Sequence, residues 1–273
     1  ELVLKEWNVL EELEKILYPD GLDCLMSVEP SNNSDVIRPS PSSVSLASMD
    51  TTGNDTANSP MNTTTGASVA SGTDTKRGKR TPPNAREGSL LLVRALAETV
   101  GRPVEPYLVG NFLVAALDEC ASSSLAVREA AEDAATALVE LAHPWAFLQL
   151  TSRILLTAMQ STEWRVKYAA LERLGQCGVS TAPQQVHQRL PQLIPLVTAQ
   201  IWDTKPQVTK AAGSCLLAIC NTCQNPDVKS AIPAVVQAIC KPADTNKAVQ
   251  ELMSTTFVVS VDAPTLAILC PVL

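Results

Sequence analysis

The feature that most constrains this chain is an internal repeat of about 38–42 residues in its C-terminal two thirds. A proline that follows a large apolar residue recurs every 38 residues, at Pro195, Pro233 and Pro271. A second mark is a valine near the start of an alanine-rich helix, with a basic residue just after it. This mark occurs at Val127, Val166 and Val208, at intervals of 39 and 42 residues. Two marks with one period indicate stacked units, because a single helix pair cannot cover its own apolar faces and needs a neighbour to do so.

Each unit has the pattern of a helix, a short turn and a second helix. The second helices carry an apolar stripe at helical spacing: Val127, Ala131, Ala134 and Leu138; Val166, Ala170, Leu174 and Cys177; Val208, Ala212, Cys215 and Ile219. The recurring prolines fall in the first helices and predict bends there, because proline removes a backbone hydrogen bond. A bent first helix with a straight second helix is the HEAT pattern. We therefore predict an all-α solenoid of HEAT repeats.

The repeat marks also predict where the helix pairs lie. We expect pairs at about 104–141, 144–178, 184–223 and 228–259, and a fifth pair that starts near Asp262. Residues 86–100 read as the second helix of an earlier pair.

Composition divides the chain into three parts. Residues 1–26 contain an amphipathic helix, with apolar residues such as Leu10 and Leu17 at spacings of three and four. Residues 27–85 are rich in Ser, Thr, Asn and Pro, so we predict a disordered insertion or linker. Its basic cluster, 76–80, is read either as a solvated charge cluster or as a contact for phosphate or nuclear import. Residues 86–273 form the solenoid, which we expect to be truncated at its C-terminal end.

Charge and hydropathy exclude some functions. The formal net charge is −7 and the isoelectric point is near 5.0, which argues against general nucleic-acid binding but leaves room for a local basic patch. There is no apolar run of membrane-spanning length and no signal peptide. We therefore expect a cytoplasmic protein without a membrane partner.

The sequence lacks the motifs of a catalytic site. It has no phosphate-binding glycine-rich loop with a following lysine, and no dinucleotide fingerprint. The two histidines, His143 and His187, have no partners nearby in sequence that would make a metal or proton-transfer site. Cys220 and Cys223 form a Cys-x-x-Cys without the second ligand pair that zinc requires. We expect core thiols, no enzymatic activity, and no cofactor or metal in this chain.

The remaining candidates are cations that we expect at the turns or at the starts of the second helices. They are Arg128, Arg165, Lys167, Arg173, Lys205 and Lys210. Since the turns of successive repeats line up along one edge of a solenoid, these side chains could form a basic ridge that contacts RNA phosphates. The alternative is local pairing with carboxylates, for example Glu163 with Lys167 four residues on. Both interpretations stand at this point, because residues 104–273 hold 11 basic and 14 acidic side chains.

Several strings resemble the HEAT domain of the translation elongation factor 3 family. They are 185–196 (QVHQRLPQLIPL), 201–208 (IWDTKPQV), 104–107 (VEPY), 255–258 (TTFV), 263–266 (APTL) and the opening 9–13 (VLEEL). A relative, the large ribosome-bound activator of the amino-acid-starvation kinase, carries similar repeats. Residues 86–88 and 261–264 are closer to that relative, whereas the opening helix and Trp202-Asp203-Thr204-Lys205 favour the elongation factor.

The resemblance implies a ribosome-docking scaffold of an ABC-type ATPase that promotes release of deacylated tRNA from the ribosomal exit site. It implies the ribosome and other elongation factors as partners, and ATP and Mg²⁺ as cofactors of the full-length parent only. The alternatives are the scaffold of the starvation-kinase activator and a free-standing HEAT adaptor. The family's catalytic residues have no counterpart in this chain, and the insertion at 27–85 departs from the family pattern.

Overall fold

The computed structural model describes residues 9–18 and 81–273, which belong to one compact unit. These residues form helices joined by short turns, without a strand in either range, and the predicted all-α solenoid is confirmed. The predicted insertion at 27–85, with its basic cluster, lies outside the described residues except for its last five positions. The solenoid begins slightly earlier than the predicted residue 86, since α3 starts at Pro83, where the fixed φ of proline favours a first helical turn.

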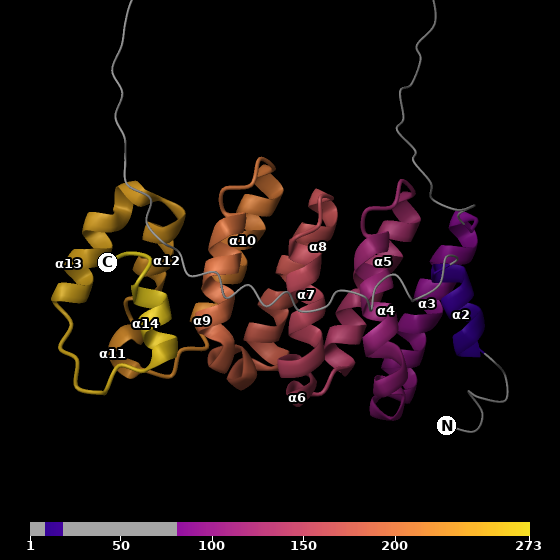
Figure 1. The fold of residues 1–273 in the computed structure, drawn as a ribbon, viewed down its shortest axis with the longest axis horizontal. Helices are drawn as coiled ribbons and strands as arrows, with labels where there is room; N and C mark the ends of the chain where they lie inside the picture. Colours follow the sequence, from indigo (N-terminus) through magenta and orange to yellow (C-terminus); the bar gives the residue numbers. More distant parts are fainter. Residues whose placement is uncertain (1–8, 19–80) are drawn as a thin grey trace, which may run out of the picture. The chain divides into compact units, whose positions relative to one another are not determined.

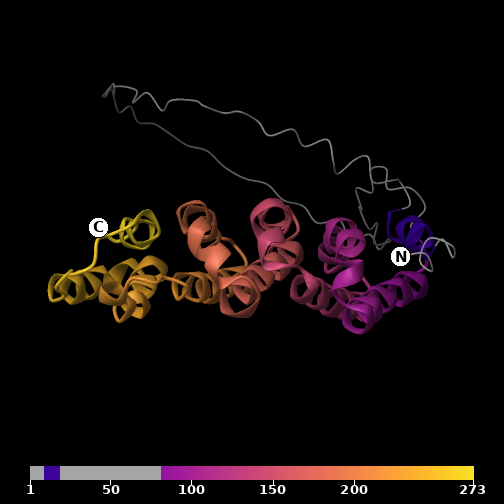
Figure 2. The same cartoon turned by 90° about the horizontal axis from the view of Figure 1, so that it is seen from below.

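The helices follow one another in pairs along the row shown in Figure 1. Their bounds are α3 (Pro83–Val100); α4 (Glu105–Glu119) and α5 (Leu125–Leu141); α6 (Pro144–Ala146), α7 (Ser152–Met159) and α8 (Trp164–Gln176); α9 (Pro183–Gln200) and α10 (Pro206–Cys220); α11 (Pro226–Lys229), α12 (Ile232–Cys240) and α13 (Thr245–Met253); and α14 (Ala263–Leu269). A π-helical turn, Phe147–Thr151, joins α6 to α7, and another, Cys177–Thr181, follows α8. In Figure 2 the first helices α4, α7 and α9 lie in one layer, and the second helices α5, α8 and α10 lie in the other.

The predicted stripes of the second helices form the core between these layers. All twelve stripe residues are buried, and Ala131, Ala170 and Ala212 near the middle of each helix are fully inaccessible. A methyl side chain at these places lets neighbouring helices approach closely, so each repeat covers the apolar face of the next.

The π-helical turn after α8 approaches α10 closely at Gly178. A β-carbon on Gly178 would lie 3.2 Å from the Ala218 carbonyl oxygen and 3.3 Å from Ile219 Cα, whereas one on Gly175 would lie 3.6 Å from Cys215 Cα. Both distances at Gly178 are shorter than an ordinary contact, whereas the distance at Gly175 is not. Gly178 is therefore required by helix packing, while the site of Gly175 has room for a methyl group.

The prediction that the recurring prolines fall inside the first helices holds in part. Pro191 and Pro195 lie inside α9, where their missing N–H groups interrupt the hydrogen-bond ladder. Pro233 instead stands in the first turn of α12, after a break that separates it from α11. Pro271 follows α14. In those two places proline marks a helix boundary, because the first turn needs no N–H donor and a helix end tolerates proline.

The last helix starts where the repeat pattern predicts it. A fifth pair is expected to start near Asp262, and Asp262 caps α14, which packs back against α9 and α12 (Figure 1). Polar contacts hold the returning segment: the Asp227 carboxylate accepts hydrogen bonds from the Val258 and Val259 N–H groups at 2.7 and 2.8 Å, and buried Thr265 lies 3.7 Å from Cys223 Sγ. These long-range contacts have no signature in the repeat pattern.

The amphipathic N-terminal segment packs on the first repeats. Its helix, α2 (Val9–Leu17), buries Leu13 and Leu17 against the solenoid. The Tyr18 hydroxyl donates a hydrogen bond to the Asn111 carbonyl oxygen at 2.5 Å, and the Asn111 amide donates one to Glu14 at 2.8 Å. Helix α2 therefore covers apolar surface of α3 and α4.

Most of the described cysteines are core thiols, as predicted. Cys120, Cys177, Cys215, Cys220 and Cys223 are buried and free, and burial raises the pKa of Cys177 and of Cys220 to about 12. Cys240 is half-buried. Cys270 differs, because its thiol is exposed.

The two glycines of the α8–α10 contact make a matched pair for mutation. Gly178→Ala should lower the free energy of unfolding by about 1–3 kcal/mol, because the new methyl group meets backbone that cannot move aside easily. Gly175→Ala should be neutral or raise it by up to about 1 kcal/mol, since alanine favours the helix and ordinary contact distance is available. Urea unfolding followed by far-UV circular dichroism measures both. Equal effects of the two substitutions would contradict the close approach at Gly178.

Thiol labelling tests the cysteine core. Cys270 should react with a maleimide within minutes in native buffer, because thiolate formation and access both favour an exposed thiol. Cys177, Cys215 and Cys220 should react only after denaturation. Peptide mapping by mass spectrometry locates the label, and Cys270→Ser is the control. Rapid native labelling of Cys215 would show that the core is open.

Candidate functional site

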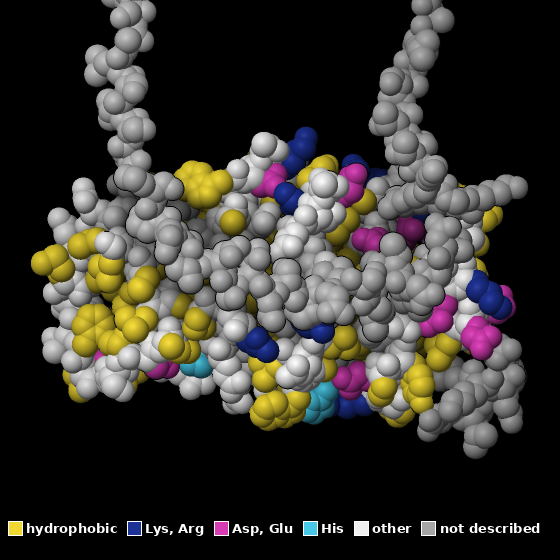
Figure 3. Space-filling model, in the orientation of Figure 1, with side chains coloured by type: hydrophobic (Ala, Val, Ile, Leu, Met, Phe, Trp, Pro, Cys, Tyr) yellow, Lys and Arg dark blue, Asp and Glu magenta, His cyan; other side chains and the backbone are white. Residues whose placement is uncertain are grey.

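The turns that join first to second helices lie on one side of the row of repeats (Figure 1). We call this side the turn edge; it comprises residues 120–124, 160–163 and 201–205 with the first turns of α5, α8 and α10. Charged and hydrophobic side chains are mixed along the corresponding upper rim of Figure 3. Five of the six predicted cations lie on or next to this edge, and Arg173 lies further along α8.

Three of the six predicted cations are held by contacts within the protein. Arg128 donates hydrogen bonds to the carbonyl oxygens of Ser122 and Ser123 at 2.9 and 3.1 Å, which closes the turn before α5. Lys167 forms an ion pair with Asp203, with 2.7 Å between Nζ and Oδ2. The predicted alternative of local pairing is thus realised for Lys167 with a residue of the next repeat, and not with Glu163.

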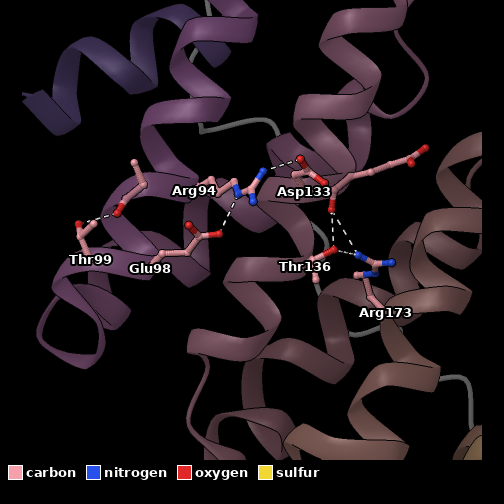
Figure 4. A network of polar contacts seen from close by, with 8 residues as sticks. Arg94, Glu98, Thr99, Asp133, Thr136 and Arg173 are labelled. Atoms are coloured by element: carbon pink, nitrogen blue, oxygen red, sulfur yellow. Dashed lines mark hydrogen bonds and ion pairs between the residues drawn. The ribbon is translucent and has the colours of Figure 1, made fainter.

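Arg173 is part of a polar network between second helices, shown in Figure 4. Its guanidinium donates to the Thr136 hydroxyl and, at 3.3 Å, to the Glu132 carbonyl oxygen of α5. Further along the same network Arg94 of α3 bonds Asp133 at 2.5 Å and Glu98 at 2.7 Å. The network links three successive second helices and occupies Arg173.

The other three predicted cations remain exposed. Arg165 lies over the ring of Trp164, with 4.9 Å from its central carbon to the ring centroid. Lys205 and Lys210 extend from the start of α10. Within the described chain none of the three is paired with a carboxylate, so their charges are available to a partner.

A groove of about 560 Å³ lies between α8 and α10, beside the turn edge. Its walls carry Tyr168, Glu172, Arg173 and Lys210. Tyr168 donates a 2.5 Å hydrogen bond to Glu172, which raises the pKa of the phenol to about 12. The groove wall therefore carries a carboxylate, Glu172, and a guanidinium, Arg173, and both are held in place by hydrogen bonds.

Sequence reasoning missed one prominent residue of the edge, Trp202. The turn before α10 leaves 66% of this side chain exposed. The sequence did contain a signal for its exposure, because Trp202 stands directly before the turn residues Asp203 and Thr204. That signal is weak, since a tryptophan in a repeat protein can equally be buried between helices.

A second surface is apolar and lies over α12–α14, where Figure 3 shows hydrophobic side chains gathered. Its exposed members are Met253, Phe257, Val258, Val259, Val261 and Leu266. Patches of this kind mark interaction surfaces. Its chemistry differs from that of the turn edge, because these exposed members are all apolar.

The histidines have structural contacts. His143 caps α6, since its Nδ1 accepts a hydrogen bond from the Trp145 N–H at 3.2 Å. His187 is buried, with Nε2 3.8 Å from Asp262 Oδ2. Within residues 9–18 and 81–273 there is no group of three His, Cys, Asp or Glu side chains that could hold a metal ion.

None of the helices in these ranges is long and apolar enough to span a membrane.

Comparison with known proteins gives consistent matches. The family model described as EF3 N-terminal HEAT repeat matches residues 67–216, and the model described as Elongation factor 3/GNC1 HEAT repeat matches residues 244–273. Elongation factor 3 of Mycosarcoma maydis is 33% identical over 198 residues, 72% of this chain and 18% of that protein. The stalled ribosome sensor GCN1 of Homo sapiens is 33% identical over 190 residues, 68% of this chain and 7% of that protein.

The mRNA export factor elf1 of Schizosaccharomyces pombe is 30% identical over 190 residues, 69% of this chain and 18% of that protein. The chain thus spans less than a fifth of the length of these relatives. The matched models are HEAT-repeat models and not models of a catalytic domain.

Proposed function

This chain belongs to the EF3 N-terminal HEAT-repeat family, and from that premise we propose that it is the ribosome-docking scaffold of an elongation-factor-3-like protein. In this proposal the solenoid holds the parent protein on the ribosome, and ATP-binding cassettes elsewhere in that parent use ATP and Mg²⁺ to promote release of deacylated tRNA from the exit site. The partners are the ribosome and other elongation factors, and the place of action is the cytoplasm.

The observation that carries the proposal is the set of exposed cations on the turn edge. Arg165, Lys205 and Lys210 extend from two successive repeats, on a chain whose formal net charge is −7. An acidic body with a local line of free cations favours contact with phosphates at one surface and disfavours general adhesion to nucleic acid. The names of the matched relatives support the same reading, since one is an elongation factor and another a ribosome sensor.

The packing of the repeats supports a scaffold role. Each helix pair is tied to its neighbour by buried stripes and by polar contacts, so the edge is a continuous surface whose side chains keep fixed spacing. A preorganised surface loses little conformational entropy when it binds a large partner.

The second candidate is the scaffold of a GCN1-like ribosome sensor. The observation that favours it is the equal identity, 33%, to elongation factor 3 and to GCN1. Two Walker A motifs elsewhere in the coding sequence select the elongation factor, and further HEAT repeats in their place select the sensor. A free-standing adaptor remains the candidate if neither is encoded.

Charge reversal tests ribosome docking. The triple variant Arg165→Glu, Lys205→Glu, Lys210→Glu should weaken co-sedimentation with ribosomes. It should also make the plot of the logarithm of the binding constant against the logarithm of the salt concentration less steep by about 2–3, since each phosphate contact contributes about 0.7–0.9 to that slope. Lys167 is left unchanged, because its reversal would break the ion pair with Asp203.

The matched control reverses three exposed cations away from the turn edge. Arg102→Glu, Arg153→Glu, Lys229→Glu makes the same change in net charge on inter-repeat segments and a first helix. Co-sedimentation should stay close to that of the unmodified chain. An equal loss of co-sedimentation in both triple variants would attribute binding to overall charge. It would refute the proposal that the turn edge contacts the ribosome.

A further inference from the structure

Trp202 occupies an unusual position on the turn edge. Its side chain is 66% exposed, although burying a tryptophan in a repeat core would stabilise the fold. Its backbone lies in the short turn between α9 and α10, so the ring projects from a fixed point and not from a long loop.

The turn that carries Trp202 is held rigidly. The Asp203 carboxylate accepts hydrogen bonds from Lys167 Nζ at 2.7 Å and from the Lys205 N–H at 2.9 Å. The Thr209 hydroxyl donates to the Asp203 carbonyl oxygen at 3.2 Å. The Lys167 contact ties this turn to the first turn of α8, where Trp164 and Arg165 lie. Trp202 therefore has a defined place beside the turn of the neighbouring repeat.

The charge around Trp202 favours an anionic partner. Lys205 stands three residues after Trp202 and is exposed, and Arg165 is stacked over Trp164 on the adjoining turn. The nearby negative charge of Asp203 is offset by Lys167. An exposed aromatic ring on a turn that also carries Lys205, next to the turn that carries Arg165, offers what a nucleotide needs: a stacking surface for the base and positive charge for its phosphates.

A second exposed tryptophan provides the contrast. Trp145 is 63% exposed, in α6 on an inter-repeat segment. No lysine or arginine occurs within four residues of it in the sequence. On the same segment the Glu105 carboxylate accepts a hydrogen bond from the His143 N–H at 2.7 Å, and Arg189 donates one to the Leu148 carbonyl oxygen at 2.8 Å. Exposure is thus shared by both tryptophans, whereas an exposed lysine on the same turn is found at Trp202 and not at Trp145.

We propose that the turn edge binds unpaired RNA, with a base stacked on Trp202 and the flanking phosphates contacted by Arg165 and Lys205. This inference rests on the proposed ribosome docking and narrows it from phosphate contact to recognition of a single-stranded or flipped-out nucleotide. A regular duplex offers phosphates to the same cations but keeps its bases stacked on each other, so it leaves the Trp202 ring without a partner.

The test measures binding of a fluorescein-labelled 12-nucleotide oligo(U) and of a 12-base-pair RNA duplex to the chain by fluorescence anisotropy at low salt. Trp202→Ala should weaken oligo(U) binding at least about fivefold, within the range for loss of one base–aromatic stack, and should leave duplex binding within about twofold. Trp202→Phe should retain most of the affinity. Trp145→Ala, the matched control, should change neither.

Two further arms keep the outcome decisive. If Trp202→Ala lowers the urea midpoint, Trp202→Leu replaces it, because leucine keeps an apolar side chain without an aromatic face. Ribosome co-sedimentation of the same variants separates the two proposals. Loss of co-sedimentation in Trp202→Ala with no oligo(U) binding by the unmodified chain would assign the ring to a ribosomal protein and overturn the RNA inference.

Absence of ribosome co-sedimentation by the unmodified chain would refute the proposed function, while the oligo(U) measurements would still decide whether Trp202 binds RNA. Equal weakening by Trp202→Ala and Trp145→Ala, or equal effects on single-stranded and duplex RNA, would also overturn base stacking.

Discussion

Gly178 brings the end of α8 against the backbone of Ala218 and Ile219 in α10, so close that a β-carbon would lie 3.2 Å from a carbonyl oxygen. The same need for close approach explains the fully buried alanines at the centres of the second helices. Because each pair buries its apolar face only against its neighbours, contacts of this kind determine both stability and the spacing of everything on the surface.

That spacing is visible in the polar contacts between repeats. Arg94 meets Asp133 39 residues later, Lys167 meets Asp203 36 residues later, and Arg173 reaches Thr136 37 residues earlier. The separations match the repeat because equivalent positions of successive units lie side by side. The surface network thus follows from the same stacking that forms the core, and it occupies several of the cations that would otherwise face solvent.

The division of the cations explains the character of the turn edge. Arg165 and Lys167 are two residues apart in one helical turn, yet one is exposed over Trp164 and the other is paired with Asp203. What remains on the edge is a small set of free cations and an exposed tryptophan. Such a surface combines charge for approach with an aromatic face for specific contact, which neither the acidic body nor the apolar patch over α12–α14 provides.

The sequence by itself determined the solenoid, the helix pairs from α4 to α10 and the buried stripes, because these depend on local periodicity and on small residues at repeated positions. It also identified the cations of the turn edge as a set. Only the tertiary structure decided which of them are free, that Trp202 is exposed, and that α14 packs back against α9. The reason is physical: the partners in these contacts, such as Asp203 for Lys167 and Asp227 for Val258, come from other repeats or distant segments, and a periodic pattern specifies that neighbours meet but not which side chains pair.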